Sequence, residues 1–393
     1  MKKIAFLIYD LQTGGAERAV SNISNRLNKI SGFEVFVMTI SGEKPNYKID
    51  SKLIQLNLDS KANIFSKFSL FIRRIKKLKK LKKQYKFDVV ISFLPTSDIL
   101  NIFTKLRFQK SIVSVRIYQP NQIKQDLIER VYDKLLKYTY KKADKIVAVT
   151  SAIKNQIISK YLIEDSKIIV IENAYDISEI KLLTQEVLNY NERHIFDKPV
   201  IICSGGLHDR KSQDLIIEAY SKIQNKEKYN LVILGSGVNK NKYIALCKEL
   251  MVTENVFLLG HVKNPYKYLH RSIVFIMASK YEGFPNAMAE ALICELPIIS
   301  TNLDSGAREI MSIKKTVFKE INSPIKLDGG YLVAKNELNA NHIKNEILVN
   351  QLKETLQEII NDKKMRESFR KKNKILVDKI NIDKRIYEWI NIF

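Results

Sequence analysis

Cysteine is scarce in this sequence, which excludes a scaffold held together by disulfides. The 393 residues include three cysteines, Cys203, Cys247 and Cys294, and no Cys-x-x-Cys pair. Disulfide frameworks and structural zinc sites need several closely spaced cysteines or histidines, and only His208 lies near any of these three. We therefore interpret the cysteines as small apolar core residues of a protein suited to a reducing cytosol.

Long apolar runs are also missing. No stretch approaches the roughly 20 apolar residues that a membrane-spanning helix needs. The start of the chain imitates a signal peptide, since two lysines precede the apolar run Ile4–Tyr9. That run is short, ends at Asp10 and lacks a small-residue cleavage site, so it predicts a first buried strand instead.

Acidic residues are outnumbered by basic ones, 42 against 66, which gives a formal net charge of +24. Such an excess implies an acidic partner: nucleic acid, an anionic membrane surface or a phosphorylated substrate. The hydrophobic content of 45% is ordinary for a soluble globular protein. A chain of this length is too long for one ordinary core and predicts two domains.

Short apolar strands alternate with amphipathic helices along almost the whole chain. Helical periodicity is clear at 20–27 and 128–138. The expected strands are 4–9, 35–40, 89–93, 112–115 and 145–149, then 200–203, 230–234, 256–259, 273–277 and 297–300. This alternation is typical of an α/β protein with parallel sheets. The polar stretch 189–198 separates the two series, so we predict two Rossmann-like domains.

We place the domains at 1–188 and 189–377, followed by a helix at 378–393. In this last segment four large apolar residues recur at helical spacing and form one apolar face. They are Ile386, Trp389, Ile390 and Phe393.

A basic segment, 64–87, interrupts the first series. Its apolar residues recur every three positions, at Ile72, Ile75, Leu78 and Leu81. Its cations are Arg73, Arg74, Lys76, Lys77, Lys79, Lys80, Lys82, Lys83 and Lys86. On a helix this pattern fits a membrane-surface element, and it fits equally a solvated helix whose apolar stripe packs on the sheet. No recognised nucleic-acid motif accompanies the charge, which disfavours a nucleic-acid partner.

The segment 279–309 carries the most specific signal. Glu282 and Glu290 stand eight positions apart, and the turn Gly283-Phe284-Pro285-Asn286 directly follows the first. An apolar strand precedes the turn, and Pro285 suits the first position of a helix. Free N–H groups at a helix start favour a negative group such as a phosphate, and Gly283 lets a ligand approach the backbone. Amides for a diphosphate and carboxylates for hydroxyls are what a nucleotide sugar needs.

This segment resembles the Glu-x7-Glu signature of family 4 glycosyltransferases, and the match continues through 296–301 and 305–309. The resemblance implies a GT-B fold: two Rossmann-like domains facing across a cleft, with the C-terminal helix returning to the N-terminal domain. It also implies transfer from a nucleotide sugar with retention of configuration. Carried over, Glu282 contacts the donor sugar and Glu290 holds the ribose.

The stretch 204–214 looks like the family's Gly-Arg-Leu-x-x-x-Lys-Gly motif, whose arginine and lysine grip the diphosphate. Lys211 matches the lysine. Gly206 stands where the arginine is expected, which is a clear departure. Arg210 could supply the missing charge, although adjacent residues point in different directions.

Other positions match the family less specifically. The N-terminal Gly14-Gly15-Ala-Glu matches a common family turn, with Gly15 as a donor contact and Gly14 as an acceptor contact. Val262 lies in a loop whose backbone would read the base. Arg116 ends a strand of the first domain and is a candidate acceptor contact.

We therefore predict a retaining, hexosyltransferase-type glycosyltransferase of surface polysaccharide (capsule) biosynthesis. Its donor would be a nucleotide sugar, with a UDP-sugar preferred, and its acceptor a lipid-linked or growing glycan. No Asp-x-Asp pair occurs, so neither a metal nor another cofactor is expected. The protein would be cytoplasmic and peripheral at the inner face of the cell membrane, without a nucleic-acid partner. The alternatives are a GT-B sugar-nucleotide epimerase and a non-catalytic nucleotide-sugar-binding protein.

Overall fold

The computed structural model describes residues 1–59, 64–120, 127–313 and 321–393. Within them the chain divides into two compact units. We call these unit 1 (residues 1–176 and 381–393) and unit 2 (residues 177–380).

The first division falls earlier than the predicted boundary at 188/189. The helix α6 (Ile177–Thr184) packs on α9 (Tyr266–His270) of unit 2, and Arg271 donates a hydrogen bond to the carbonyl of Thr184. These contacts make α6 part of unit 2. The second division, at 380/381, lies close to the predicted one.

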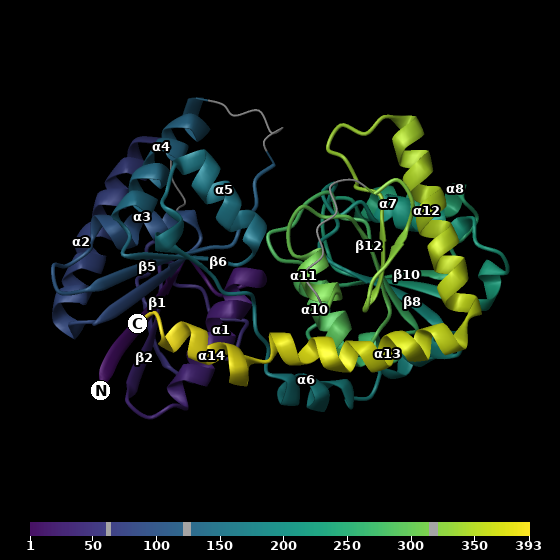
Figure 1. Ribbon diagram of the computed structural model, residues 1–393, viewed down its shortest axis with the longest axis horizontal. Helices are drawn as coiled ribbons and strands as arrows, with labels where there is room; N and C mark the ends of the chain where they lie inside the picture. The colour runs from purple at the N-terminus through teal and green to yellow at the C-terminus, as the bar shows by residue number, and fades with distance from the viewer. Residues whose placement is uncertain (60–63, 121–126, 314–320) are drawn as a thin grey trace. The chain divides into compact units, whose positions relative to one another are not determined.

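Unit 1 is built on a seven-stranded, wholly parallel sheet with helices on both faces (Figure 1). In spatial order the strands are β3 (Lys52–Gln55), β2 (Phe33–Thr39), β1 (Lys2–Ile8), β4 (Val89–Phe93), β5 (Lys110–Val115), β6 (Lys145–Ala148) and β7 (Ile168–Val170). The helices are α1 (Gly15–Asn28), α2 (Ile64–Tyr85), α3 (Pro95–Phe103), α4 (Leu127–Lys142), α5 (Ser151–Tyr161) and α14 (Ile382–Ile390).

The central strand β1 shows why both faces need helices. Successive side chains of a strand point to opposite faces of the sheet. Ile4 and Phe6 belong to the core that α1 and α14 cover, whereas Ala5 and Leu7 belong to the core that α2 and α3 cover. All four side chains are fully buried. A continuous apolar run is therefore what a central parallel strand requires.

The C-terminal helix α14 packs on α1 within unit 1. Trp389, only 1% exposed, stacks on Phe93 with ring centroids 6.2 Å apart. The returning chain is fixed at its entry by a hydrogen bond of 2.9 Å from the Ile382 N–H to the carbonyl of Tyr175. The last residues are thus part of the unit 1 core.

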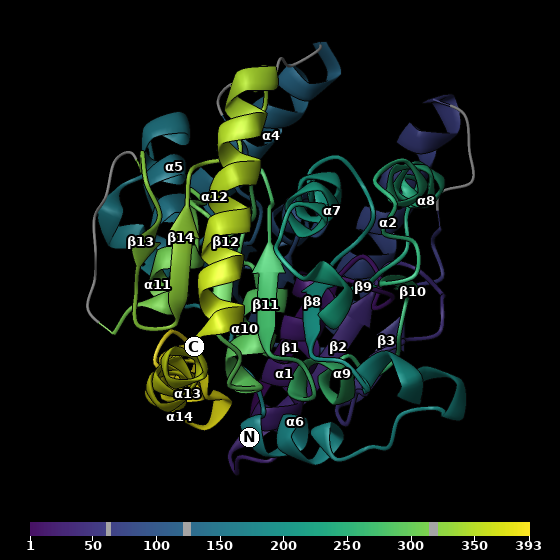
Figure 2. The same cartoon turned by 90° about the vertical axis from the view of Figure 1, so that its right-hand side faces the viewer.

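Unit 2 repeats the architecture with a second seven-stranded sheet (Figure 2). Its strands, in spatial order, are β10 (Val256–Gly260), β9 (Asn230–Leu234), β8 (Val200–Ser204), β11 (Val274–Met277), β12 (Ile298–Thr301), β14 (Gly330–Val333) and β13 (Ile325–Lys326). Only the short edge strand β13 is antiparallel to its neighbour among these. The remaining helices are α7 (Gln213–Ser221), α8 (Lys240–Glu249), α10 (Asn286–Ile293), α11 (Ala307–Met311), α12 (His342–Asn361) and α13 (Lys363–Val377).

All ten strands expected from the sequence are present, and the α/β prediction is confirmed. The sequence analysis missed β3, β7, β13 and β14. These four lie at or next to a sheet edge and are at most four residues long. Short outer strands lack the long apolar run by which a central strand is recognised.

The apolar stripe of α2 packs on the sheet. Leu78 is fully buried in the core with Ala5 and Leu7, and Ile75 and Leu81 pack against the same cluster. Of the two interpretations of the basic segment, the structure supports the helix whose apolar stripe packs on the sheet. The stripe is therefore not available to a membrane. Over the described ranges, every helix is too short or too polar to cross a bilayer.

Three cations of α2 are used inside unit 1. Arg74 donates two hydrogen bonds to the carbonyl of Leu58, and Lys77 donates one to the carbonyl of Leu56. Lys82 is fully buried and donates to Asn101, and its burial lowers the pKa of its amine well below the ordinary value. Lys77 is nevertheless exposed. The other exposed cations of the segment are Arg73, Lys76, Lys79, Lys80 and Lys83 of α2 and Lys86 just after it, a set that we call the cationic face.

Replacing Trp389 by alanine tests the role of the returning helix. We expect Trp389→Ala to lower the free energy of unfolding of unit 1 by about 3–5 kcal/mol, because a large buried ring is lost and a cavity remains. Urea denaturation followed by far-UV circular dichroism measures the change. Tyr387→Ala is the control on the same helix, since Tyr387 is 60% exposed and should cost within about 0.5 kcal/mol. Similar losses in both variants would contradict the packing role.

Candidate active site

The order of the strands in unit 2 brings two predicted site segments together. From β8 the chain runs outward to β9 and β10 and then returns to β11 on the other side of β8. The sheet therefore reverses its strand order between β8 and β11. In open parallel sheets ligands bind beyond the carboxyl ends of the strands at such a point. The loop after β8 carries Arg210 and Lys211, and the loop after β11 carries Glu282.

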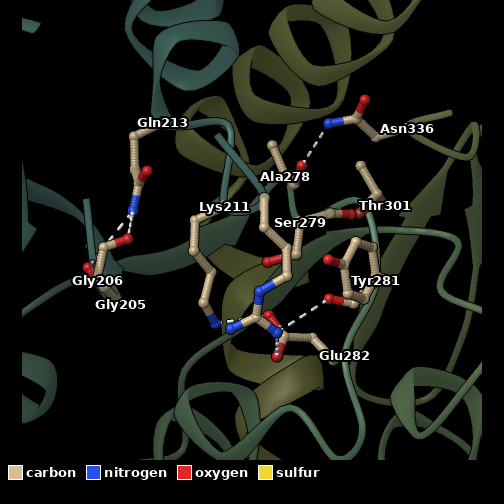
Figure 3. Close-up of polar contacts among 11 residues, drawn as sticks. Gly205, Gly206, Lys211, Gln213, Ala278, Ser279, Tyr281, Glu282, Thr301 and Asn336 are labelled. Atoms are coloured by element: carbon tan, nitrogen blue, oxygen red, sulfur yellow. Dashed lines mark hydrogen bonds and ion pairs between the residues drawn. The ribbon is translucent and has the colours of Figure 1, made fainter. Parts of the chain in front are cut away.

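These three side chains form one ion cluster. The Nζ of Lys211 lies 2.5 Å from one carboxylate oxygen of Glu282, and an Nη of Arg210 lies 3.1 Å from the other. Figure 3 shows Lys211 and Glu282 pointing toward each other from their two loops. The guanidinium of Arg210 also packs over the ring of Tyr281, 5.5 Å from its centroid. Adjacent residues of the β8 loop thus reach the same carboxylate.

The carboxylate of Glu282 is buried and remains ionised. Burial alone would raise its pKa, but the charges of Lys211 and Arg210, with a hydrogen bond from Lys211, hold the pKa of Glu282 below its ordinary value. Breaking a buried ion pair by removing one partner costs far more than an exposed pair contributes. The cluster therefore fixes the two loops on each other.

Two buried amides hold the backbone around the cluster (Figure 3). Asn336, which follows β14, donates to the hydroxyl of Ser212 (2.9 Å) and to the carbonyl of Ala278 (2.7 Å), and so ties the β8 loop to the β11 loop. Gln213 donates to the carbonyl of Gly206 at 3.0 Å. Sequence reasoning missed both residues, because a buried amide far along the chain has no motif of its own.

The turn after Glu282 is held by the loop that follows β12. The hydroxyl of Ser305 donates to the carbonyl of Gly283 at 2.6 Å. Gly306 has φ = +87°, and a Cβ there would lie 2.5 Å from Cδ of Pro285. Only glycine therefore lets the two loops approach this closely.

The helix after the turn begins one residue later than predicted. The first residue of α10 is Asn286, and Pro285 precedes it as the cap, not as the first helical residue. The carbonyl of Pro285 accepts hydrogen bonds from Met288 and Ala289. Phe284 and Glu290 are both buried, with Glu290 on α10.

Neighbouring glycine loops complete this edge of the sheet. The N–H of Gly235, just after β9, donates to the carbonyl of Gly260, the last residue of β10, at 2.7 Å. A Cβ on Gly235 would lie 2.0 Å from the carbonyl oxygen of Gly205, so the β8 and β9 loops touch through their backbones. Val262 follows Gly260 and is half-buried. Gly235 thus serves the packing of these loops.

Gly206, the departure from the family motif, lies under a neighbouring side chain. A Cβ at this position would come 3.1 Å from the imidazole of His208. Burial, followed by the charges of Arg210 and Lys211, lowers the pKa of His208 from its ordinary value. A side chain at position 206 would therefore be crowded by the imidazole of His208.

Three predicted contacts belong to unit 1. Gly14 caps α1, and Gly15 is its first residue. The carboxylate of Glu17 lies over Gly14, and burial, reinforced by Asp10, raises the pKa of Glu17 despite hydrogen bonds from the backbone. Arg116 follows β5 and is 8% exposed, with hydrogen bonds to Ser114 and Asn173. The sequence analysis included Glu17 only as part of the family turn and gave it no role, because its burial is what distinguishes it.

The arrangement in unit 2 suits an anionic ligand with hydroxyl groups. Two cations converge on one buried carboxylate, next to the start of α10, at the edge where parallel sheets bind ligands. Across the described residues, no group of three or more histidine, cysteine or acidic side chains is placed to hold a metal ion.

Comparison with known families assigns both halves of the chain. Residues 13–179 match the family described as Glycosyltransferase Family 4, and residues 189–375 match the family described as Glycosyl transferases group 1.

Three similar proteins illustrate the match. An uncharacterized glycosyltransferase of Methanocaldococcus jannaschii is 33% identical over 285 residues, covering 70% of each chain. The N-acetylgalactosamine-N,N'-diacetylbacillosaminyl-diphospho-undecaprenol 4-alpha-N-acetylgalactosaminyltransferase of Campylobacter jejuni is 30% identical over 315 residues, or 79% of this chain and 83% of that protein. The crystal structure of Anabaena HepE in complex with UDP and glucose has a TM-score of 0.72 at 14% identity, covering 100% of this chain and 99% of that one. The overlap with a solved glycosyltransferase fold confirms the predicted GT-B fold class.

Replacing Gly306 by alanine tests the contact that holds the turn. We expect Gly306→Ala to lower the free energy of unfolding by about 2–5 kcal/mol, from about 1–2 for the positive φ and about 1–3 for the overlap with Pro285. Gly32→Ala is the matched control, because Gly32 has φ = +94° with no atom within 4 Å of the added Cβ. It should cost only about 1–2 kcal/mol. Equal losses in chemical denaturation would mean that the overlap with Pro285 has no effect.

Proposed function

The chain belongs to the family 4 glycosyltransferases, and we propose that it is a retaining, metal-independent enzyme that transfers a hexose-type sugar from a UDP-sugar to a lipid-linked glycan of surface polysaccharide biosynthesis. The observation that carries this proposal is the ion cluster of Arg210, Lys211 and Glu282 at the strand-order reversal of unit 2. The relatives described above are glycosyltransferases and lend the epimerase alternative no support.

In the proposed donor complex the two cations neutralise the diphosphate. Lys211 and Arg210 already lie side by side on Glu282, so a diphosphate placed there meets two positive charges without rearrangement of the chain. Charge on the departing diphosphate grows during transfer, and fixed cations stabilise it as it develops. Gly283, Phe284, Pro285 and Asn286 would contribute the backbone at the start of α10.

The carboxylates have separate roles in this proposal. Glu282 orients the donor sugar and stabilises positive charge at the anomeric carbon, and Glu290 holds the ribose. Backbone groups at Val262 contact the base. In unit 1, Gly15 contributes to donor binding, and Gly14 and Arg116 contribute to acceptor binding.

Metal independence is proposed from the cluster and from the sequence. Two side-chain cations supply the positive charge that a divalent ion supplies in transferases with an Asp-x-Asp pair, and this chain has no such pair. Retention of configuration is proposed from family membership. The choice of UDP is supported by the HepE complex, and the lipid-linked acceptor by the name of the Campylobacter jejuni relative.

A peripheral position on an anionic membrane is proposed from the cationic face of α2. Its six side chains are exposed, and each cation near an anionic leaflet contributes about 1 kcal/mol. Phe68, on the same helix, is 71% exposed. Phe103 and Tyr138, from α3 and α4, are also exposed, and Phe103 contacts both Phe71 and Tyr138. Exposed aromatic rings next to cations suit the interfacial region of a bilayer, whereas the buried stripe of α2 cannot contact it.

A thermal-shift screen without metal tests the donor site. With EDTA present, we expect a UDP-sugar to raise the melting temperature more than GDP- or ADP-sugars, because a ligand at a hundredfold excess over its Kd stabilises the folded state by about 2.7 kcal/mol. Glu290→Ala should abolish the shift. Glu249→Ala, an exposed residue on α8, should leave it intact.

Two results of this screen and one result of a transfer assay would count against the proposal. A shift that disappears in EDTA and returns with magnesium would contradict metal independence. A full shift in Glu290→Ala would contradict the ribose contact. Donor binding without transfer to any lipid-linked acceptor would favour the non-catalytic binding protein.

Charge removal tests the membrane contact. We expect replacement of the six residues of the cationic face by glutamine to abolish co-sedimentation with vesicles that contain phosphatidylglycerol, since six favourable charge contacts are lost. The control changes the same number and types of cation on α13 of unit 2. These are Lys363, Lys364, Arg370, Lys371, Lys372 and Lys374, all exposed.

The matched control separates location from net charge. Both variants lose six positive charges, one arginine and five lysines. If both lose vesicle binding equally, the overall charge and not the cationic face attracts the membrane. Unchanged binding of the α2 variant would exclude the proposed surface.

A further inference from the structure

The strand order of unit 1 also reverses, between β1 and β4. From β1 the chain runs to β2 and β3 on one side and then returns to β4 on the other. The same rule that places a ligand at the edge of unit 2 therefore applies to the carboxyl ends of β1 and β4. The helix that follows β4 carries Asp98, and the neighbouring strand β5 ends just before Arg116.

Asp98 is a buried acid with unused hydrogen-bonding capacity. It is 1% exposed, and among the residues that the structure describes neither carboxylate oxygen makes a hydrogen bond of normal geometry, although the Ser92 side chain lies near enough to lower its pKa. Burial raises the pKa of Asp98 well above its ordinary value, although Ser92 and Arg116 act in the opposite direction. Burial therefore favours the protonated side chain, which has one O–H donor and acceptor lone pairs.

Arg116 has one unused donor in the same place. Its Nε donates to Ser114 at 3.1 Å, its Nη1 donates to Asn173, and its guanidinium lies 4.7 Å from the centroid of the Phe93 ring. The remaining nitrogen, Nη2, is buried without a partner in the described part of the chain. Unsatisfied buried polar groups cost roughly 1–3 kcal/mol each, so two of them in one place call for a shared polar partner, either water or a ligand group.

Both groups line one small recess within unit 1. Its volume is about 30 Å³, and Leu94, Tyr140 and Gln156 also form its wall. A water molecule needs roughly 10–15 Å³ on this scale, so the recess admits a hydroxyl or hydroxymethyl group and excludes a phosphate.

We propose that this recess binds a hydroxyl group of a sugar acceptor, which accepts a hydrogen bond from Nη2 of Arg116 and exchanges hydrogen bonds with the carboxylic acid of Asp98. A sugar hydroxyl both donates and accepts, as the two groups require. The aromatic side chain of Tyr140 adds an apolar wall. This inference rests on the proposed glycosyltransferase function.

A neutral hydroxyl fits the recess better than an anionic group does. Two acidic side chains, Glu17 and Asp98, already lie close enough to the guanidinium of Arg116 to act on its pKa. They belong to two separate elements of unit 1. An additional carboxylate would approach both of them. A hydroxyl satisfies the free donor and acceptor without adding charge to a buried site.

Binding of simple sugars to variants of Asp98 tests the proposal. Methyl glycosides of glucose, galactose, N-acetylglucosamine and N-acetylgalactosamine are titrated by saturation-transfer NMR, with and without UDP. We expect Asp98→Leu to weaken binding of the preferred glycoside about tenfold or more, because the leucine supplies no polar atom. Asp98→Asn should retain most of the affinity, since a neutral amide also donates and accepts. Asp165→Leu is the control for replacing an aspartate by leucine, because the side chain of Asp165 is 73% exposed.

A double-mutant cycle that combines monodeoxy sugars with Asp98→Leu identifies which sugar hydroxyl enters the recess. One monodeoxy analogue should bind the wild type about tenfold more weakly than its parent and bind Asp98→Leu no differently from its parent. If Asp98→Leu does not fold, Asp98→Ala replaces it in the cycle, because alanine also supplies no polar side-chain atom. Asp98→Leu should melt at or above the wild-type temperature, since it removes a buried unpartnered acid.

The possible failures are distinguishable. Equal affinity of wild type and Asp98→Leu overturns the recess, as does a wild type that shifts with a donor but binds none of the four glycosides. Asp98→Asn binding as weakly as Asp98→Leu overturns the neutral acid. The donor thermal shift is a separate experiment that tests the site in unit 2. Its absence would count against the proposed function and not against the recess.

Discussion

The interaction on which the candidate active site depends is the pairing of Glu282 with two cations from another loop. A carboxylate that is 6% exposed needs compensation, and Lys211 and Arg210 supply it at 2.5 and 3.1 Å. Because the partners come from loops after β8 and β11, the cluster holds the two sides of the strand-order reversal together. The hydrogen bonds of Asn336 between the same loops act in the same direction. The edge of the sheet is therefore assembled before any ligand is present.

Strand order explains why polar groups collect in two places. In both units the chain moves outward from a central strand, returns, and continues on the other side, so two loops diverge at one edge. The chain can place charged groups there without burying them inside the sheet. In unit 2 the collected groups are matched to each other as an ion cluster. In unit 1, Asp98 and Arg116 keep unmatched hydrogen-bonding atoms, which is why the two edges suit different chemistry.

Much of this organisation could be predicted from the sequence, because most strands of these parallel sheets are apolar runs, and all ten strands expected from such runs are present. Glu282 and Lys211 were found through their motifs, although only the structure shows that they touch. The stripe of α2 allowed two interpretations, since an apolar face packs equally well on a sheet or in a bilayer. Asp98 could not have been selected, because its burial and its lack of partners depend on helices that are distant in the sequence.

The departure at Gly206 is best understood through the geometry of the β8 loop. The proposed diphosphate site needs a positive charge, but the imidazole of His208 lies against Gly206, and its burial and the nearby cations lower its pKa, which favours the uncharged form. Arg210 starts four residues further along and reaches the same carboxylate as Lys211 while it packs on Tyr281. The positive charge that the family motif assigns to position 206 can thus be delivered from position 210. An uncharged imidazole next to two cations adds no repulsion between them, whereas an arginine at 206 would bring a third positive charge against a single carboxylate. The glycine at position 206 and the arginine at position 210 are therefore consistent with each other.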